Sequence, residues 1–206
     1  MSGFFVLKLP EADSTEPQTR YQAVDARFAP GEKCAACGDA GPTQWSSPYR
    51  VKLIASGVLL SDVAFGPRTD LLVTREFQSF WQAHGLSGLS GFEPVDVVDV
   101  SANTTFTGEE RAYLHCAVER TEGWIDDKES EVERTGGRTC PQCGNGGVLK
   151  HLRRVVLKNL PWRLPDLFLV KCLPIAVLAS PRFAKALGKS ALTGCELVAA
   201  EQIRAL

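Results

Sequence analysis

The sequence carries one short motif twice, as CAACG at residues 34–38 and as CPQCG at residues 140–144. Each copy holds two cysteines separated by two residues, with a glycine directly after the second cysteine. Two cysteines at this spacing bind one zinc ion from a tight turn, and two such turns complete a four-thiolate site. The glycine suits the turn because it adopts positive φ without steric cost. The motif therefore predicts a metal-binding knuckle in each half of the chain.

A gap of 102 residues separates Cys37 from Cys140, which is much longer than the usual spacing between zinc knuckles. We expect each knuckle to supply half of one site, in which a single zinc ion is bound by Cys34, Cys37, Cys140 and Cys143. Such sites have apparent binding energies of about 10–16 kcal/mol in small peptides, so one ion would join the two halves firmly. Four thiolates leave no position open for water, which predicts a structural and not a catalytic role.

The two motifs are related by an offset of 106 residues, and the same offset aligns further residues. Ten identities fall in the 58 positions from residue 31 to residue 88, against about four expected from residue frequencies. They lie mostly at glycines, cysteines and helix ends, where backbone geometry restricts the residue type. We interpret the chain as two copies of one unit, residues 1–105 and 106–206, that form one compact domain. The alternative is a single fold with two similar knuckles at a coincidental spacing.

Each copy predicts the same order of elements: an extended segment, the knuckle, aliphatic strands, a short helix and a closing strand. The matching segments are 4–9 and 111–120, 49–60 and 152–160, 70–74 and 175–180, 75–84 and 181–187, and 92–100 and 195–203. Thr74 and Ser180 are the expected helix N-caps, and Gly85 and Gly188 are the expected left-handed C-caps. The predicted fold class is α+β, with two similar halves of short strands and short helices joined at one zinc-ribbon-like site.

Other roles for the cysteines stay open at this point. A CxxC pair can be a thiol redox site, a knuckle can have lost its metal, and a cysteine can be a small hydrophobic core residue. Cys116, Cys172 and Cys195 lie in apolar segments, which predicts buried free thiols. His151 follows the second knuckle by eight residues and is the one histidine placed to substitute for a cysteine ligand.

Composition and charge predict a globular protein of the cytoplasm. The chain has 44% hydrophobic residues, 23% charged residues and a net charge of −1, which disfavours a general electrostatic attraction to nucleic acid or to an anionic membrane. The first 13 residues lack the basic leader of a signal peptide, and the most apolar stretch, 167–179, is too short to span a bilayer. In the cytoplasm thiols stay reduced, so paired cysteines favour metal binding over disulfides.

No catalytic motif is recognisable, because the chain lacks GxSxG, HExxH, a phosphate-binding loop and GxGxxG. Asp96 and Asp99 are three residues apart in a predicted strand, so we expect them on opposite faces and not as a carboxylate pair. These observations predict a protein without enzymatic activity.

Two segments carry concentrated charge. The segment 126–133 is acidic, which is typical either of a solvated surface or of a docking site for a basic protein. The segment 150–158 is basic, and it is either solvated, part of a strand, or a nucleic-acid contact.

Three features together point to a known family. They are the two CxxCG motifs about a hundred residues apart, the segment DLLVTREFQSFWQAHGLSGL at 70–89, and the segment ASPRFAKALGKSALTG at 179–194. These features resemble the double-CXXCG-motif proteins of myxobacteria, over nearly the whole chain. The resemblance implies that Cys34, Cys37, Cys140 and Cys143 are the metal ligands.

The resemblance also implies a function, because members of that family are described as immunity proteins in kin discrimination. The chain would then bind and neutralise a cognate protein toxin, with no membrane, nucleic acid or small-molecule substrate as partner. No toxin-contacting residue carries over, because paralogous immunity proteins must differ at those positions to be specific. The alternatives are a zinc-ribbon protein that binds nucleic acid or regulates, suggested by the knuckles and the basic segment, and a thiol redox enzyme.

Overall fold

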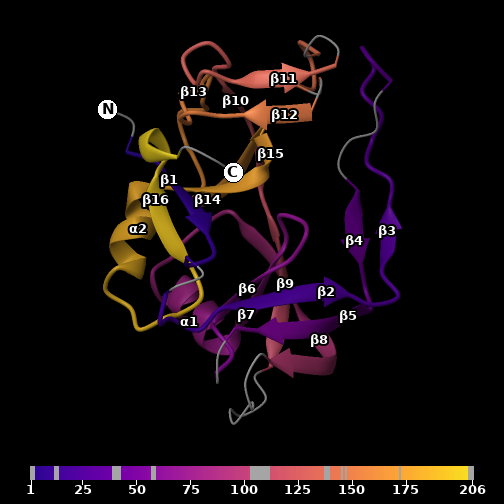
Figure 1. The fold of residues 1–206 in the computed structure, drawn as a ribbon, viewed down its shortest axis with the longest axis vertical. Helices are drawn as coiled ribbons and strands as arrows, with labels where there is room; N and C mark the ends of the chain where they lie inside the picture. Colours follow the sequence, from indigo (N-terminus) through magenta and orange to yellow (C-terminus); the bar gives the residue numbers. More distant parts are fainter. Residues whose placement is uncertain are drawn as a thin grey trace.

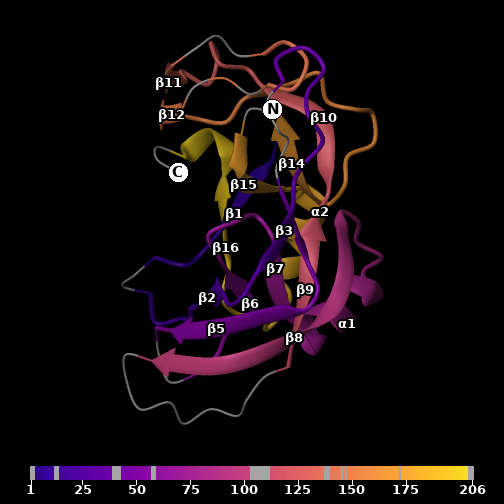
Figure 2. The same ribbon diagram turned by 90° about the vertical axis from the view of Figure 1, so that its right-hand side faces the viewer.

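The structure is a computed structural model that describes residues 3–11, 14–38, 43–56, 59–102, 112–136, 140–144, 146, 148–171 and 173–203. Strands make up 45% of these residues and helices 11%. The two main sheets, a closed six-stranded barrel and a six-stranded half-barrel, are stacked along the long axis of the molecule (Figures 1 and 2). The protein is therefore mostly β, and the prediction of an α+β fold is wrong.

The barrel has the strand order β2-β5-β8-β9-β7-β6 and closes where β6 pairs with β2. Its strands are β2 (Thr19–Ala23), β5 (Tyr49–Ala55), β6 (Val63–Phe65), β7 (Leu71–Thr74), β8 (Leu89–Ala102) and β9 (Tyr113–Val118). Alternate side chains of β2 and β5 are buried, as expected for strands with one face toward a core. Tyr21, Leu53 and Tyr113 belong to the cluster that fills the barrel.

The half-barrel has the strand order β13-β10-β14-β15-β1-β16. Its strands are β1 (Phe5–Lys8), β10 (Arg120–Ile125), β13 (Leu157–Lys158), β14 (Leu167–Lys171), β15 (Leu173–Ala179) and β16 (Glu196–Ala199). The edge strands β13 and β16 have only two and four residues. In the described residues β13 and β16 do not pair with each other, so this sheet stays open, whereas β5 and β8 pair along Tyr49–Ala55 within the closed barrel.

The half-barrel repeats the strand order of the barrel with one cut. Each strand of the half-barrel has a counterpart in the barrel. In the order of the half-barrel, these counterparts are β5, β2, β6, β7, β9 and β8. This is also the order of neighbours around the barrel, starting at β5 and ending at β8. Strand directions correspond as well, because β2–β6 and β10–β14 are both parallel pairs, while β6–β7 and β14–β15 are both antiparallel. This correspondence supports the proposed duplication.

The first strand of each proposed copy lies in the sheet of the other copy. β1 pairs with β15 and β16, and its counterpart β9 pairs with β7 and β8. The two sheets are thus interlocked by a reciprocal exchange of strands, and neither is built from one continuous half of the sequence. The division into residues 1–105 and 106–206 stays a prediction, and its boundary lies outside the described residues.

The two helices lie where the sequence predicts them. They are α1 (Arg75–Ala83) and α2 (Pro181–Leu187), and a 3₁₀ helix, η1 (Ala200–Gln202), follows β16. The hydroxyls of Thr74 and Ser180 accept hydrogen bonds from the third residue beyond them, at 3.3 and 3.1 Å, which confirms both N-caps. Gly85 takes a left-handed φ of +56°, but the prediction for Gly188 is wrong, since its φ is −64°.

The helices bury the junction between the two sheets. Phe77 and Trp81 of α1 pack with Phe183 of α2, with Trp81 at 6.0 Å from each of the other two ring centroids. The same cluster contains Leu71 from the barrel and Leu167 from the half-barrel, so both sheets share this core.

Within the described chain, no helix has the length and apolar character needed to cross a membrane.

A β-bulge overturns the expectation for two carboxylates. The register of β5 against β8 shifts after Val51, so that Val98 is the extra residue between Asp96 and Asp99. Asp96 forms an ion pair with Arg50 at 3.1 Å, and Asp99 forms one with Lys52 at 3.4 Å. The two carboxylates therefore lie on the same face, and the prediction of opposite faces is wrong.

The sequence gives little sign of the β fold because many strands have polar outer faces. β2 reads TRYQA and β8 has no fully buried side chain, so neither gives a continuous apolar signal. The segment 152–160 was predicted as one strand but is a strand only at Leu157–Lys158. The sequence therefore understates the number of strands, while the two short helices stand out through their caps and their apolar faces.

Candidate metal centre

Each CxxCG motif lies at the end of a two-stranded ribbon. β3 (Arg27–Ala29) and β4 (Gln44–Ser46) flank the first knuckle, and β11 (Glu133–Thr135) and β12 (Val148–His151) flank the second. Figure 1 shows the first ribbon along one side of the molecule and the second across its top. The knuckles at the ends of the two ribbons contact each other, so that Cys34 lies beside Cys140 and Cys37 beside Cys143, each pair 106 positions apart in sequence.

The four cysteines form one cluster. All four Sγ atoms lie within 4.8 Å of one another, with Cys34 at 3.9 Å from Cys140 and Cys37 at 3.6 Å from Cys143. A tetrahedral ion with metal–sulfur bonds of about 2.3 Å places its ligands about 3.8 Å apart. The donor set and its spacing therefore fit a metal ion bound by four thiolates, and the cluster is a candidate metal site.

The backbone of each knuckle has the predicted turn. The amide of Gly38 donates to the carbonyl of Cys34 at 2.8 Å, and the amide of Gly144 donates to the carbonyl of Cys140 at 2.9 Å. The two glycines have φ of +75° and +77°, a conformation that side chains rarely adopt. The glycine that completes each motif is therefore required by the turn and not by the metal itself.

Backbone amides also favour the thiolate form of the first cysteine in each knuckle. Hydrogen bonds from the amides of Cys143 and Gln142 lower the pKa of the Cys140 thiol to about 7. The equivalent amides, with Cys37 first, lower the pKa of Cys34. Since the thiolate is the form that binds metal, these turns prepare the cluster for a cation.

The other candidate ligands take no part in this cluster. His151 ends β12 and is not one of the grouped residues. Cys116 and Cys195 are buried free thiols, as predicted, and burial raises the pKa of each to about 12. The prediction for Cys172 lies outside the described residues.

The acidic and basic segments contact each other, which the sequence did not indicate. Glu131 forms ion pairs with Arg153 at 2.8 Å and with Arg154 at 3.9 Å, and Asp126 lies 3.5 Å from Lys158. These pairs occupy the two arginines on which the nucleic-acid alternative depends. They also reduce the free negative charge available to attract a basic partner.

The structure contains a second buried polar cluster, of which the sequence gives no sign. The His115 ring stacks on Tyr49 with centroids 4.0 Å apart, and the Trp45 ring meets His115 edge-on at 5.3 Å. His115 Nε2 lies 3.9 Å from Asp70, too far for a hydrogen bond. These residues come from four separate segments, so no local sequence motif predicts that they lie together.

We expect His115 to make stability depend on pH. Burial lowers the pKa of its imidazole below 6.5, although Asp70 and Glu93 oppose the shift. Below about pH 6.5 the unfolded chain therefore binds a proton that the folded chain excludes, and stability falls as pH falls. Between pH 7.5 and 5.0 the free energy of unfolding in urea should drop by up to about 2 kcal/mol more in the native protein than in His115→Phe. Equal losses in the two proteins would contradict this assignment.

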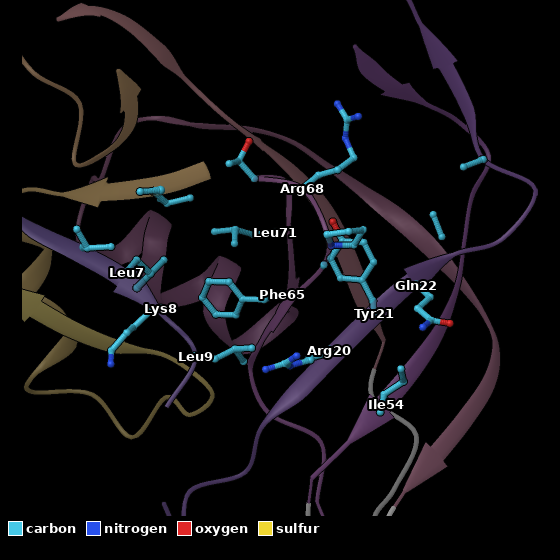
Figure 3. Close-up of a pocket in the computed structure, with 18 of the residues that line it drawn as sticks. Leu7, Lys8, Leu9, Arg20, Tyr21, Gln22, Ile54, Phe65, Arg68 and Leu71 are labelled. Atoms are coloured by element: carbon cyan, nitrogen blue, oxygen red, sulfur yellow. The ribbon is translucent and has the colours of Figure 1, made fainter. Parts of the chain in front are cut away.

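The largest cavity described, of about 920 Å³, lies between the barrel and the half-barrel. Figure 3 shows Phe65 and Leu71 among its apolar lining, with the basic side chains of Lys8, Arg20 and Arg68 around them. Lys8 pairs with Glu196 at 2.7 Å and Arg68 with Asp70 at 3.3 Å. This cavity contains no cysteine of the cluster, so it is separate from the candidate metal site.

Neither the protein-family models nor the curated proteins contain a match to this chain. The fold and the cysteine cluster define a mostly β protein of two interlocked sheets with a candidate metal centre where its two ribbons meet.

Proposed function

We propose that the protein is a zinc-stabilised binding protein without catalytic activity, and specifically an immunity protein that neutralises a cognate toxin. The observation that carries the zinc assignment is the gathering of Cys34, Cys37, Cys140 and Cys143 at tetrahedral spacing. Zinc favours four thiolates, and four protein ligands leave no site for a reacting water. The ion would join the two ribbons and so hold the barrel and the half-barrel in a fixed relation.

The zinc assignment is tested by the metal content of protein purified without added metal. We expect one zinc per chain by mass spectrometry and almost none in Cys34→Ser. The matched control is Cys116→Ser, a buried thiol outside the cluster, which should keep its zinc. Iron in place of zinc, or an absence of metal from the native protein, would overturn the assignment.

The immunity role is supported by the resemblance of the paired motifs and by one exposed loop. Trp162 is 85% exposed, and the guanidinium of Arg163 lies 4.1 Å above its ring. Tryptophan and arginine are the residues most enriched at energetic centres of protein interfaces. Pro161 precedes the pair, and the buried Asp166 closes the loop. We propose that this loop inserts Trp162 into the toxin.

Replacing Trp162 by alanine should weaken toxin binding by at least about 2 kcal/mol, or about 30-fold in Kd. The fold should be unaffected, since an exposed substitution changes stability by less than about 0.5 kcal/mol. Titration calorimetry with the purified toxin measures the first effect and urea unfolding the second. Val98→Ala, another exposed apolar residue, on β8, is the control and should bind normally. Unchanged affinity in Trp162→Ala would remove this loop from the interface.

The function itself is tested by producing the chain together with the toxin encoded beside its gene. We expect restored growth of the toxin-producing cells and a complex that survives size-exclusion chromatography. If neither protection nor a complex is observed, the immunity role fails, whatever the metal content. The variant Trp162→Ala should protect less well than the native chain at equal protein level.

A further inference from the structure

A second cavity, of about 720 Å³, opens beside the first ribbon and is lined by the ribbon, the rim of the barrel and the start of β10. Its polar lining includes Trp45, Asp70, Glu93, His115 and Arg120, and none of the four clustered cysteines. We propose that this cavity binds a small zwitterion of the free amino-acid class, which carries one ammonium and one carboxylate. The inference does not rest on the immunity role.

Two buried ring nitrogens in the cavity wall have no hydrogen-bond partner in the part of the chain that the structure describes. They are Nε1 of Trp45 and Nε2 of His115, and the two residues are only 5% and 4% exposed. A buried polar atom without a partner costs about 1–3 kcal/mol, and native proteins keep few of them. Two such atoms in one cavity indicate that a ligand with complementary polar groups completes it.

The cavity also holds charges of both signs that are unpaired among the described residues, the positive Arg120 and the negative Glu32 and Glu93. Neither Arg120 nor Glu93 forms an ion pair or a side-chain hydrogen bond with any other described residue. Asp70 adds a second carboxylate, which is shared with Arg68 at 3.3 Å. A ligand with a single charge could pair with only one sign of charge in the cavity, whereas a zwitterion pairs with both signs.

The aromatic residues of the wall offer ring edges and not open faces. Tyr49 stacks on His115, and Trp45 lies edge-on to both of them at 5.1 and 5.3 Å. Tyr49 and Trp45 are also only 7% and 5% exposed. A nucleobase needs a free aromatic face on which to stack, so this wall favours a compact ligand recognised by hydrogen bonds and charge.

The groups of the cavity divide into two sets by chemistry. The guanidinium of Arg120 and the indole N–H of Trp45 are donors, which suit the carboxylate of the ligand. The carboxylates of Glu93 and Asp70 are acceptors, which suit the ammonium. His115 joins the acceptors, because its imidazole is neutral at pH 7 and then has one nitrogen lone pair to offer.

The test is titration calorimetry of the full chain with each of the common free amino acids at pH 7.5. We expect at least one to bind with a Kd of about 1 mM or tighter. Its N-acetyl derivative lacks the ammonium and its amide lacks the carboxylate, so both should bind at least about 10-fold more weakly. Arg120→Gln and Glu93→Gln should lose affinity to a similar extent. Both residues are exposed, so these variants should fold normally.

Arg20→Gln is the matched control, because Arg20 is an exposed arginine that lines the other cavity. Its affinity for the amino acid should equal that of the native chain. The proposal is overturned if no free amino acid binds, or if both cavity variants bind normally. It is also overturned if the N-acetyl derivative binds as well as its parent, which would indicate an anion site only, or if the amide does, which would indicate a cation site only.

Discussion

Cys34→Ser and Cys140→Ser are expected to destabilise the protein equally, and the double variant should be little worse than either single one. Each substitution removes a thiolate from the same cluster, so the first change already releases the proposed ion. Loss of a metal site belongs to the class of changes that exceed about 4 kcal/mol. Independent sites would give about twice that cost in the double variant, because effects at separate positions add.

The comparison is made by urea unfolding of the native protein, the two single variants and the double variant, each with zinc and with a chelator. The chelator should lower the native protein to the level of the variants and leave the variants unchanged. Cys116→Ser provides the control, since its thiol is buried outside the cluster and its cost should not depend on zinc. Additive costs of Cys34→Ser and Cys140→Ser would mean that the two knuckles do not share an ion.

The candidate metal site could be predicted from the sequence because its geometry is mostly local. The spacing of two cysteines and the following glycine determines the turn, and the turn determines where the sulfur atoms lie. The repeat then indicates that the two turns are equivalent. Only the final step, that Cys34 meets Cys140 across 106 residues, needed the assumption of a symmetric arrangement.

The sheets could not be predicted in the same way, because their pairing is not local. The parallel pairing of β5 with β8 closes the barrel, and neither segment has a sequence feature that indicates its partner strand. The exchange of β1 and β9 is equally hidden, since each is an ordinary apolar strand that suits either sheet. The cavity around His115 depends on these pairings, so no local sequence pattern predicts it.

One part of the repeat gains its explanation only from the structure. The sequence matches LSG at 86–88 with LTG at 192–194, and these segments cross between the sheets. Ser87 donates through its amide and hydroxyl to the Asp166 carboxylate, and Thr193 donates in the same way to Asp62. The glycine that follows is required because a Cβ on Gly88 would overlap the carbonyl oxygen of Leu167.

Asp62 and Asp166 therefore tie each sheet to the other. Asp166 accepts from the N-cap hydroxyl of Ser180 at 2.8 Å and from the amide of Ser87 at 3.0 Å. Asp62 accepts from the N-cap hydroxyl of Thr74 at 3.0 Å and from the amide of Thr193 at 2.9 Å. Each carboxylate is thus bonded to the helix start of its own copy and to the crossing segment of the other copy.

Asp166→Ala is expected to destabilise the protein by about 3–5 kcal/mol, and Asp62→Ala by a similar amount. Both carboxylates are almost fully buried, so their removal leaves several buried donors without partners and opens a gap at a helix N-terminus. Asp96→Ala is the control, because its ion pair with Arg50 is exposed and contributes about 1 kcal/mol or less. Urea unfolding measures the stability of all three variants. If either buried aspartate costs as little as Asp96→Ala, these carboxylates do not hold the two sheets together.

The same variants show whether the interlocked sheets unfold together. Trp45 lies in the barrel cluster and Trp124 packs against the half-barrel cluster, so fluorescence of two single-tryptophan proteins reports on each sheet separately. Because β1 and β9 each lie in the sheet of the other copy, we expect the two single-tryptophan proteins to unfold in coincident transitions. Asp166→Ala should then shift the midpoints of both transitions by the same amount. Separate transitions would mean that each sheet is stable alone. The exchange of strands would then connect two domains and not build one.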